Sequence, residues 1–133
     1  METDLKKLLS GFSGAAPATA DATAVVERLL KQPLPNDFKG LLHLTNGGEG
    51  FIGENYLMLW SAEEIAQYNQ SYQVDKYAPG LLLFGSDGGG EGYGFDSRTT
   101  PPSVVMVPFV GMDLKHARPT APNFTAFLQK LGG

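Results

Sequence analysis

Residues 81–96, LLLFGSDGGGEGYGFD, constrain the fold more than any other part of the chain. The segment begins with an apolar run between a Pro-Gly pair and a glycine, which is typical of a short buried strand. Asp87 then precedes three glycines, Gly88–Gly90, where the chain reverses easily because positive φ costs glycine little. After the turn, side chains alternate between the two faces of the chain, with Tyr93 and Phe95 on one face and glycines on the other. The sequence therefore predicts a β-hairpin with one aromatic face and one nearly bare face, which another backbone could approach closely.

Before this hairpin, the pattern predicts helices and no strand until residue 56. Residues 3–9 are expected to form a short helical arm, and the small residues at 11–20 a flexible linker. Asp21 has the character of an N-cap for a helix that Pro33 stops. A second helix starts at Pro35 and ends at an Asn-Gly-Gly sequence. We therefore expect a flexible arm and linker over residues 1–20 and one folded domain over residues 21–133.

The rest of the chain adds strands and helices around the hairpin. Residues 56–60 form a predicted strand, and Ser61 with Glu64 forms a capping box for the next helix, which should fade near residues 74–78. Residues 103–107 are β-branched and predict a strand, and residues 109–117 are expected to hold an edge strand. A last helix is predicted for residues 120–131. This order favours the α+β class, a single domain with a twisted antiparallel sheet packed with several helices.

Composition narrows the function further. The 133-residue chain carries a net charge of −4, which disfavours nucleic-acid binding because that needs clustered Lys and Arg. It has no cysteine, which excludes disulfides, thiolate nucleophiles and cysteine metal sites. No segment approaches the ~20 apolar residues that span a bilayer, and the N-terminus lacks the apolar core of a signal peptide. We expect a cytoplasmic protein that binds neither membranes nor nucleic acid.

Several motifs in this order resemble the SUKH superfamily, which comprises Smi/Knr-type cell-wall regulators and bacterial relatives. They are LPNDF at 34–38, NGGEG at 46–50, LMLWS at 57–61, FGSDGGG at 84–90, YGFD at 93–96 and NFTAFL at 123–128. The resemblance implies an α+β fold without known catalytic residues. It further implies a protein-binding role, as immunity proteins against toxins in bacteria or as scaffolds in fungi. The motif residues taken as structural are Pro35, Asn46, Gly47, Gly48, Trp60, Gly85, Asp87, Gly88, Gly89, Gly90 and Asp96.

Catalytic and ligand sites are weakly supported. A phosphate loop is disfavoured because Asp87 and Glu91 would repel the anion and the turn contains no base. The spacing of these acids with Asp96 matches no calcium loop, so we interpret Asp87 as bonding its own loop amides. His43 and His116 stand in exposed-looking segments without a nucleophile pattern nearby. We expect no enzyme activity, no metal and no cofactor.

The favoured function is protein binding by an immunity protein that neutralises a toxin of the nuclease or deaminase type. A regulatory scaffold module and a small-molecule binder that uses a cleft beside the glycines are the alternatives. Trp60 is interpreted as a core residue, and an edge near residues 104–110 could support a weak dimer in place of a monomer. Acids in glycine-rich loops and aromatic residues on one helix face supply the predicted contacts. The predicted partner-binding residues are Glu49, Glu54, Asp87, Glu91, Tyr68 and Tyr72.

Overall fold

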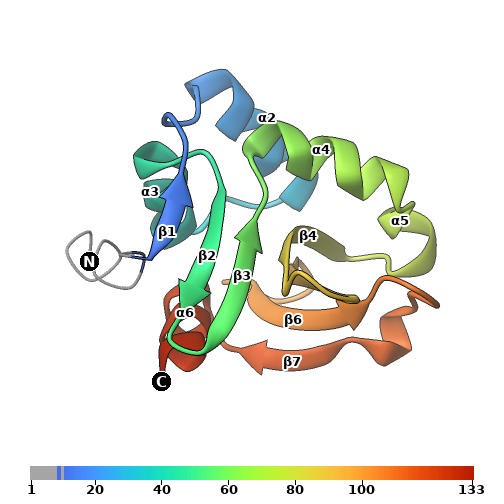
Figure 1. Ribbon diagram of the computed structural model, residues 1–133. Helices are drawn as coiled ribbons and strands as arrows, with labels where there is room; N and C mark the ends of the chain where they lie inside the picture. The colour runs from blue at the N-terminus through green and yellow to red at the C-terminus, as the bar shows by residue number, and fades with distance from the viewer. Residues whose placement is uncertain (1–8, 10) are drawn as a thin grey trace.

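The computed structural model describes residues 9 and 11–133, and in this part of the chain seven strands form one antiparallel sheet in chain order. The strands are β1 (Phe12–Gly14), β2 (Gly48–Ile52), β3 (Asn55–Leu59), β4 (Leu81–Ser86), β5 (Glu91–Asp96), β6 (Ser103–Pro108) and β7 (Arg118–Ala121). The helices are α2 (Ala20–Leu30), α3 (Asn36–Leu44), α4 (Ala62–Ser71), α5 (Val74–Tyr77), α6 (Phe124–Gly132) and the 3-10 turn η1 (Leu114–His116). In Figure 1, β1–β3 lie nearly upright in the view and β6 and β7 lie across it, so the sheet is twisted. The predicted single-domain α+β fold is confirmed.

The core lies between the β4–β5 hairpin and the helices α3 and α6, and phenylalanines build most of it. The ring of Phe38 in α3 lies 5.1 Å from that of Phe95 and 5.0 Å from that of Phe124. Phe84 packs on Phe95 at 4.7 Å and on Phe127 of α6 at 5.7 Å. Tilted and edge-to-face pairs of this kind contribute about 0.5–1.5 kcal/mol beyond their buried area. The aromatic face predicted for the hairpin is therefore its core face.

Side chains cover the other face of this hairpin. A Cβ on Gly92 would lie 2.8 Å from Cε1 of Phe109 and 3.4 Å from Cδ1 of Leu83, so both side chains use the space that the glycine leaves. The prediction that a backbone approaches this face is wrong at Gly92 but is confirmed at Gly94, where a Cβ would lie 2.9 Å from the carbonyl oxygen of Leu82. Backbone also approaches at Gly85 in β4, where a Cβ would clash with the carbonyl oxygen of Met58 in β3.

The segment before the first helix also differs from expectation. Phe12–Gly14 form the edge strand β1, which pairs with β2, and the amide of Ala18 donates to the carbonyl of Leu42 at 2.8 Å. Part of the linker predicted for residues 11–20 is thus tied to the sheet, and a strand precedes the helices. The helical arm predicted for residues 3–9 lies, apart from its last residue, outside the described residues.

Two helices begin at residues other than those predicted, because a different side chain caps each of them. Thr19 caps α2 by accepting a hydrogen bond from the amide of Ala22 at 3.1 Å, two residues before the predicted cap, Asp21. Asn123 caps α6 by accepting from an amide in its first turn at 2.8 Å. Thr120, the predicted start of this helix, belongs to β7.

Besides β1, two further strands were missed, and both lie in segments with weak strand patterns. β2 is rich in glycine, and β7 contains a proline. The prediction of an edge strand within residues 109–117 is wrong, because that segment holds a turn and η1. The exposed edge expected at residues 104–110 is also wrong, because β6 pairs with β5 on one side and with β7 on the other.

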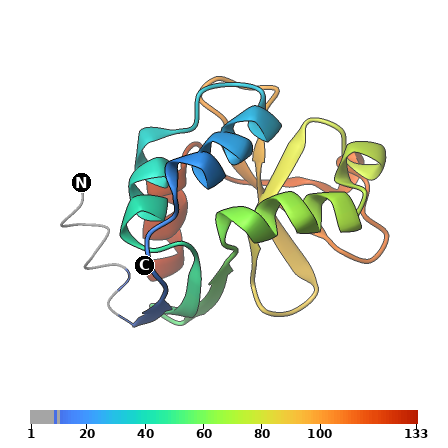
Figure 2. The same cartoon turned by 90° about the horizontal axis from the view of Figure 1, so that it is seen from above.

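At the end of β3 the chain leaves the sheet and enters α4. The predicted capping box is confirmed: the hydroxyl of Ser61 accepts from the amide of Glu64 at 3.1 Å, and the carboxylate of Glu64 accepts from the amide of Ser61 at 2.9 Å. Figures 1 and 2 show α4 lying beside α2, with the short α5 following it. None of the helices in the described part of the chain is long and apolar enough to cross a bilayer.

Candidate functional site

The outer face of the β2–β3 hairpin carries large side chains that remain partly exposed. Glu49 and Phe51 point outward from β2, opposite Met58 and Tyr56 of β3, because side chains alternate along each strand. Phe51 is 60% exposed and packs edge-on against Tyr56 at 5.1 Å. The leucines that alternate with these residues in β3 are buried in the core.

Beyond the end of β3, four aromatic rings form a closed circuit of contacts. The ring of Trp60 lies 4.8 Å from that of Tyr68, which lies 6.5 Å from that of Tyr72. Tyr72 stacks on Phe109 at 4.8 Å, and Phe109 stacks on Trp60 at 6.3 Å. Trp60 is 7% exposed, which confirms that it belongs to the core, whereas Tyr72 is 41% exposed.

These four rings line a hollow of ≈ 260 Å³, which we call the aromatic hollow. Met58, Ser86, Gly88 and Gly89 complete its lining. Because Met58 also belongs to the outer face of β2–β3, the hollow continues into the surface that carries Phe51. We call the combined surface the aromatic face; its members are Phe51, Tyr56, Met58, Trp60, Tyr68, Tyr72 and Phe109.

The turn between β4 and β5 forms one wall of the hollow. Oδ1 of Asp87 accepts hydrogen bonds from the amides two and four residues later, at 2.8 and 3.3 Å, which is the structural role predicted for this acid. Gly88 has φ +83°, and a Cβ there would lie 3.1 Å from the ring of Tyr56. Positive φ was predicted to be available at all three glycines, and of these only Gly88 adopts it. A side chain at Gly89 or Gly90 would meet little or nothing.

Carboxylates border the aromatic face. The hydroxyl of Tyr56 donates to the exposed Glu49, and the hydroxyl of Tyr68 donates to Oε2 of Glu64 at 3.3 Å. The hydrogen bond to Glu49 raises the pKa of Tyr56, and the charge of Glu64 raises that of Tyr68. Both phenols therefore stay protonated at neutral pH, and with Asp87 the border of the surface is acidic.

Asn46 connects three segments near this surface. Its backbone amide donates to the carbonyl of Ala16 at 2.9 Å, and its side-chain oxygen accepts from the backbone amide of Ala62 at 2.8 Å. Its side-chain nitrogen donates to Glu63 at 2.8 Å, which lowers the pKa of that carboxyl. The residue predicted as a helix end thus also fixes the start of α4.

The other motif residues have structural positions. Pro35 directly precedes α3, and Gly47, with φ +83°, lies against the backbone of residues 59–61. Gly48 begins β2 opposite Leu59.

Two of the predicted contact residues lie apart from the hollow. Glu91 lies two residues before Tyr93 in β5, so its side chain is on the same face of the strand as Tyr93, which packs on α6. Glu91 forms an ion pair with Arg118 of β7. Glu54 is exposed in the β2–β3 turn, next to a glycine that touches the backbone of Gly132. That turn is at the opposite end of β3 from Trp60.

Asp96 ends β5 and is engaged by Arg98. The guanidinium donates from Nε to Oδ1 and from a terminal nitrogen to Oδ2, both at 2.9 Å, and this pairing lowers the pKa of the 7% exposed Asp96. The three acids considered for calcium therefore have three different partners. Among the described residues, no group of three or more histidine, aspartate or glutamate side chains could hold a metal ion.

Both histidines are exposed on the surface. His43 is exposed in the last turn of α3, as predicted. His116 lies in η1, with Nδ1 3.3 Å from the carbonyl oxygen of Gly111. Neither ring belongs to the lining of the aromatic hollow.

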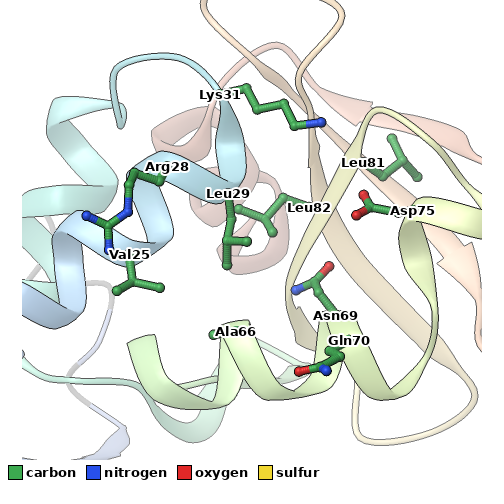
Figure 3. Close-up of a pocket in the computed structure, with 10 residues that line it drawn as sticks. All are labelled: Val25, Arg28, Leu29, Lys31, Ala66, Asn69, Gln70, Asp75, Leu81 and Leu82. Atoms are coloured by element: carbon green, nitrogen blue, oxygen red, sulfur yellow. The ribbon is translucent and has the colours of Figure 1, made fainter.

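A larger hollow, of ≈ 400 Å³, lies between α2, α4 and β4. In Figure 3, Leu29 and Leu82 lie near its centre, and the exposed Lys31 and Asp75 lie at its rim. Asn69, a further lining residue, uses its side chain to form hydrogen bonds with the backbone of β4. The rim of this hollow carries charges of both signs, and the lining contains none of the predicted contact residues.

The structure thus brings Glu49, Asp87, Tyr68 and Tyr72 to one surface. Sequence reasoning missed Phe51, Met58 and Phe109. Phe109 could have been found, because it extends the alternation of Val105 and Val107 past the end of β6, opposite the bare strand β5. Phe51 lies in the strand that was not predicted.

The model of the SMI1 / KNR4 family (SUKH-1) matches residues 17–130. The chain belongs to this family, and the predicted resemblance is confirmed. The matched range begins just before α2 and ends within α6, so it includes the aromatic hollow and both helices that precede β2. No curated protein sequence matches the chain.

Proposed function

We propose that this protein is a bacterial immunity protein that acts in the cytoplasm, without catalysis, by binding a toxin domain of the nuclease or deaminase type. Membership of the SMI1 / KNR4 family (SUKH-1) supports a protein-binding role. Toxins that act on nucleic acids need basic surfaces to hold phosphates, and an acidic border on the inhibitor would attract them. The absence of cysteine fits a reducing compartment.

The observation that carries this proposal is the aromatic face. Its residues run from the 60% exposed Phe51 to the 41% exposed Tyr72, over a floor formed by Trp60. Exposed aromatic residues surrounded by polar groups are enriched where proteins bind one another. The rings are held by one another, so little conformational entropy is lost when a partner binds.

The shape of the surface favours a protein over a small molecule. The aromatic hollow has ≈ 260 Å³, whereas pockets for small ligands measure about 300–1,000 Å³ and enclose most of the ligand. It also opens onto the outer face of β2–β3, which is a broad surface. A single side chain of a larger partner fits such a hollow.

Within the predicted contact set, Glu49, Asp87, Tyr68 and Tyr72 form the centre of the proposed surface. Glu54 and Glu91 remain part of the proposal only if the partner extends beyond the aromatic face. Charge reversal separates these two groups, since lysine at Glu49 or Asp87 should slow association strongly and lysine at Glu54 should slow it weakly.

The test uses the toxin domain encoded beside this gene. Its affinity for the full chain is measured by calorimetry, together with protection of cells that express the toxin. Tyr72→Ala should weaken binding about tenfold or more, as expected for an aromatic residue central to an interface.

Tyr77→Ala is the matched control, because Tyr77 is a 47% exposed tyrosine on α5 outside the hollow. Absence of binding and of protection would reject the immunity function. Binding to a non-toxin regulatory protein through the same face would instead support the scaffold role.

A further inference from the structure

We propose that the aromatic hollow receives one basic side chain, an arginine or a lysine, of the protein partner. This inference rests on the proposed protein-binding function and specifies the chemistry that the partner has to present. It follows from three features of the hollow: its rings, the charge around it and the state of its hydrogen-bonding groups.

The rings provide faces for a cation. Tyr72 and Phe109 stack with planes 18° apart, and Trp60 and Phe109 with planes 23° apart, so three rings are close to parallel. Tyr68 closes the circuit edge-on against Trp60, with planes 74° apart. A guanidinium stacks on such faces, and an ammonium is attracted by their negative quadrupole, most strongly by tryptophan.

Carboxylates lie around the hollow. Among the described residues that line it, none is basic. Glu64 accepts from the hydroxyl of Tyr68, and Asp87 lies in the turn that forms one wall. Glu49 holds the hydroxyl of Tyr56, whose ring contacts the same turn at Gly88. Three carboxylates therefore attract a cation and repel an anion such as phosphate.

The polar groups at the glycine-turn wall of the hollow are already engaged. The hydroxyl of Ser86 donates to the carbonyl of Glu91 at 3.0 Å and accepts from the amide of Gly88 at 3.0 Å. The amide of Gly89 is bonded to Asp87. This wall therefore offers a neutral polar ligand few free hydrogen-bonding groups, whereas a cation gains from the ring faces and the surrounding charge without needing them.

The only tryptophan of the chain provides the measurement, because its indole N–H gives one signal in an NMR spectrum. The full chain is titrated with N-acetyl-arginine amide and, separately, with the neutral isostere N-acetyl-citrulline amide. The arginine probe should shift the Trp60 signal in a saturable way, and the shift should weaken with added salt. The citrulline probe should bind at least about fivefold more weakly.

Three variants locate the effect. Tyr72→Ala should weaken binding of the arginine probe about fivefold or more, because it removes an exposed ring face. Glu64→Gln should weaken it about threefold while preserving the capping box, since glutamine also serves there. Asp75→Asn changes the net charge equally, but Asp75 belongs to the other hollow, so this variant should bind like the original chain.

Equal shifts with both probes, or no shift with arginine, would overturn the inference even if a toxin binds the aromatic face. Conversely, selective binding of arginine at Trp60 supports the inference, and failure of every toxin to bind would then count against the immunity function alone. Unchanged arginine binding by both Tyr72→Ala and Glu64→Gln also overturns it, because the cation would then lie elsewhere.

Discussion

The side-chain amide of Asn69 pairs with the backbone of Leu83 as a neighbouring strand would. Its nitrogen donates to the carbonyl of Leu83 at 2.8 Å, and its oxygen accepts from the amide of Leu83 at 2.9 Å. The nitrogen also donates to the carbonyl of Ile65 within α4, at 2.7 Å. One side chain therefore replaces β3 after that strand has left the sheet. It also fixes α4, which carries Tyr68 and is followed directly by Tyr72, against β4.

Replacing Asn69 by alanine should destabilise the protein by about 2–4 kcal/mol, because it leaves the amide and carbonyl of the fully buried Leu83 without partners. Urea unfolding measures this change. Gln67→Ala, at an exposed position of the same helix, is the control and should stay within about 0.5 kcal/mol. A loss below about 1 kcal/mol in Asn69→Ala would show that water or a neighbouring group replaces the amide.

Gly85→Ala should destabilise the protein by about 1–3 kcal/mol, because the new methyl group meets the backbone carbonyl of Met58 and neither strand can move freely. Gly90→Ala is the matched control, since a Cβ there meets nothing within 4 Å. Both variants restrict the unfolded chain equally, so the difference in their unfolding free energies reports the clash. Equal stability of the two variants would mean that β3 and β4 separate easily.

Asp96 should make stability depend on pH in the acid range. Its folded pKa lies below the usual value of about 3.9, because Arg98 binds the charged form. The stabilisation, about 1 kcal/mol given the exposure of Arg98, is therefore complete above pH ~4–5 and is lost as pH falls through the lowered pKa. Unfolding free energies of the original chain and Asp96→Asn should differ most at neutral pH and converge only as pH falls below the lowered pKa of Asp96. A difference that stays constant with pH would contradict this assignment.

Phe109→Ala should destabilise the protein less than Phe84→Ala does. Phe109 is half-buried and rests over Gly92, whereas Phe84 is fully buried in the phenylalanine core. We expect losses of about 1–2 kcal/mol for Phe109→Ala and about 3–5 kcal/mol for Phe84→Ala. Phe109→Ala should also shift the fluorescence of Trp60 to the red, because water gains access to the indole. Unchanged emission would show that Phe109 does not shield it.

Local signals explain what the sequence could predict. The β4–β5 hairpin, the capping box at Ser61 and the burial of Trp60 each depend on residues within a few positions of one another. The acids and tyrosines at the centre of the proposed surface were named for similar local reasons, their place in loops or on one helix face. Their meeting at one hollow depends on where β3 leaves the sheet, which no local pattern specifies.

The missed features depend on distant contacts. β2 contains two glycines among five residues and becomes a strand because β1 and β3 flank it. Phe109 reaches the hollow because its amide donates to the carbonyl of Gly90, two residues beyond the strand predicted for residues 103–107. Asn69 had no sequence signal, since an asparagine in a helix usually faces solvent.

The order of the strands has a consequence for how another protein can bind. Because the sheet follows the chain, its outermost strands within the described residues are β1 and β7. β1 spans three residues, and β7 contains Pro119, which has no amide hydrogen to donate. Neither margin suits main-chain pairing with a foreign strand, so recognition of this molecule has to come from side chains displayed on its faces.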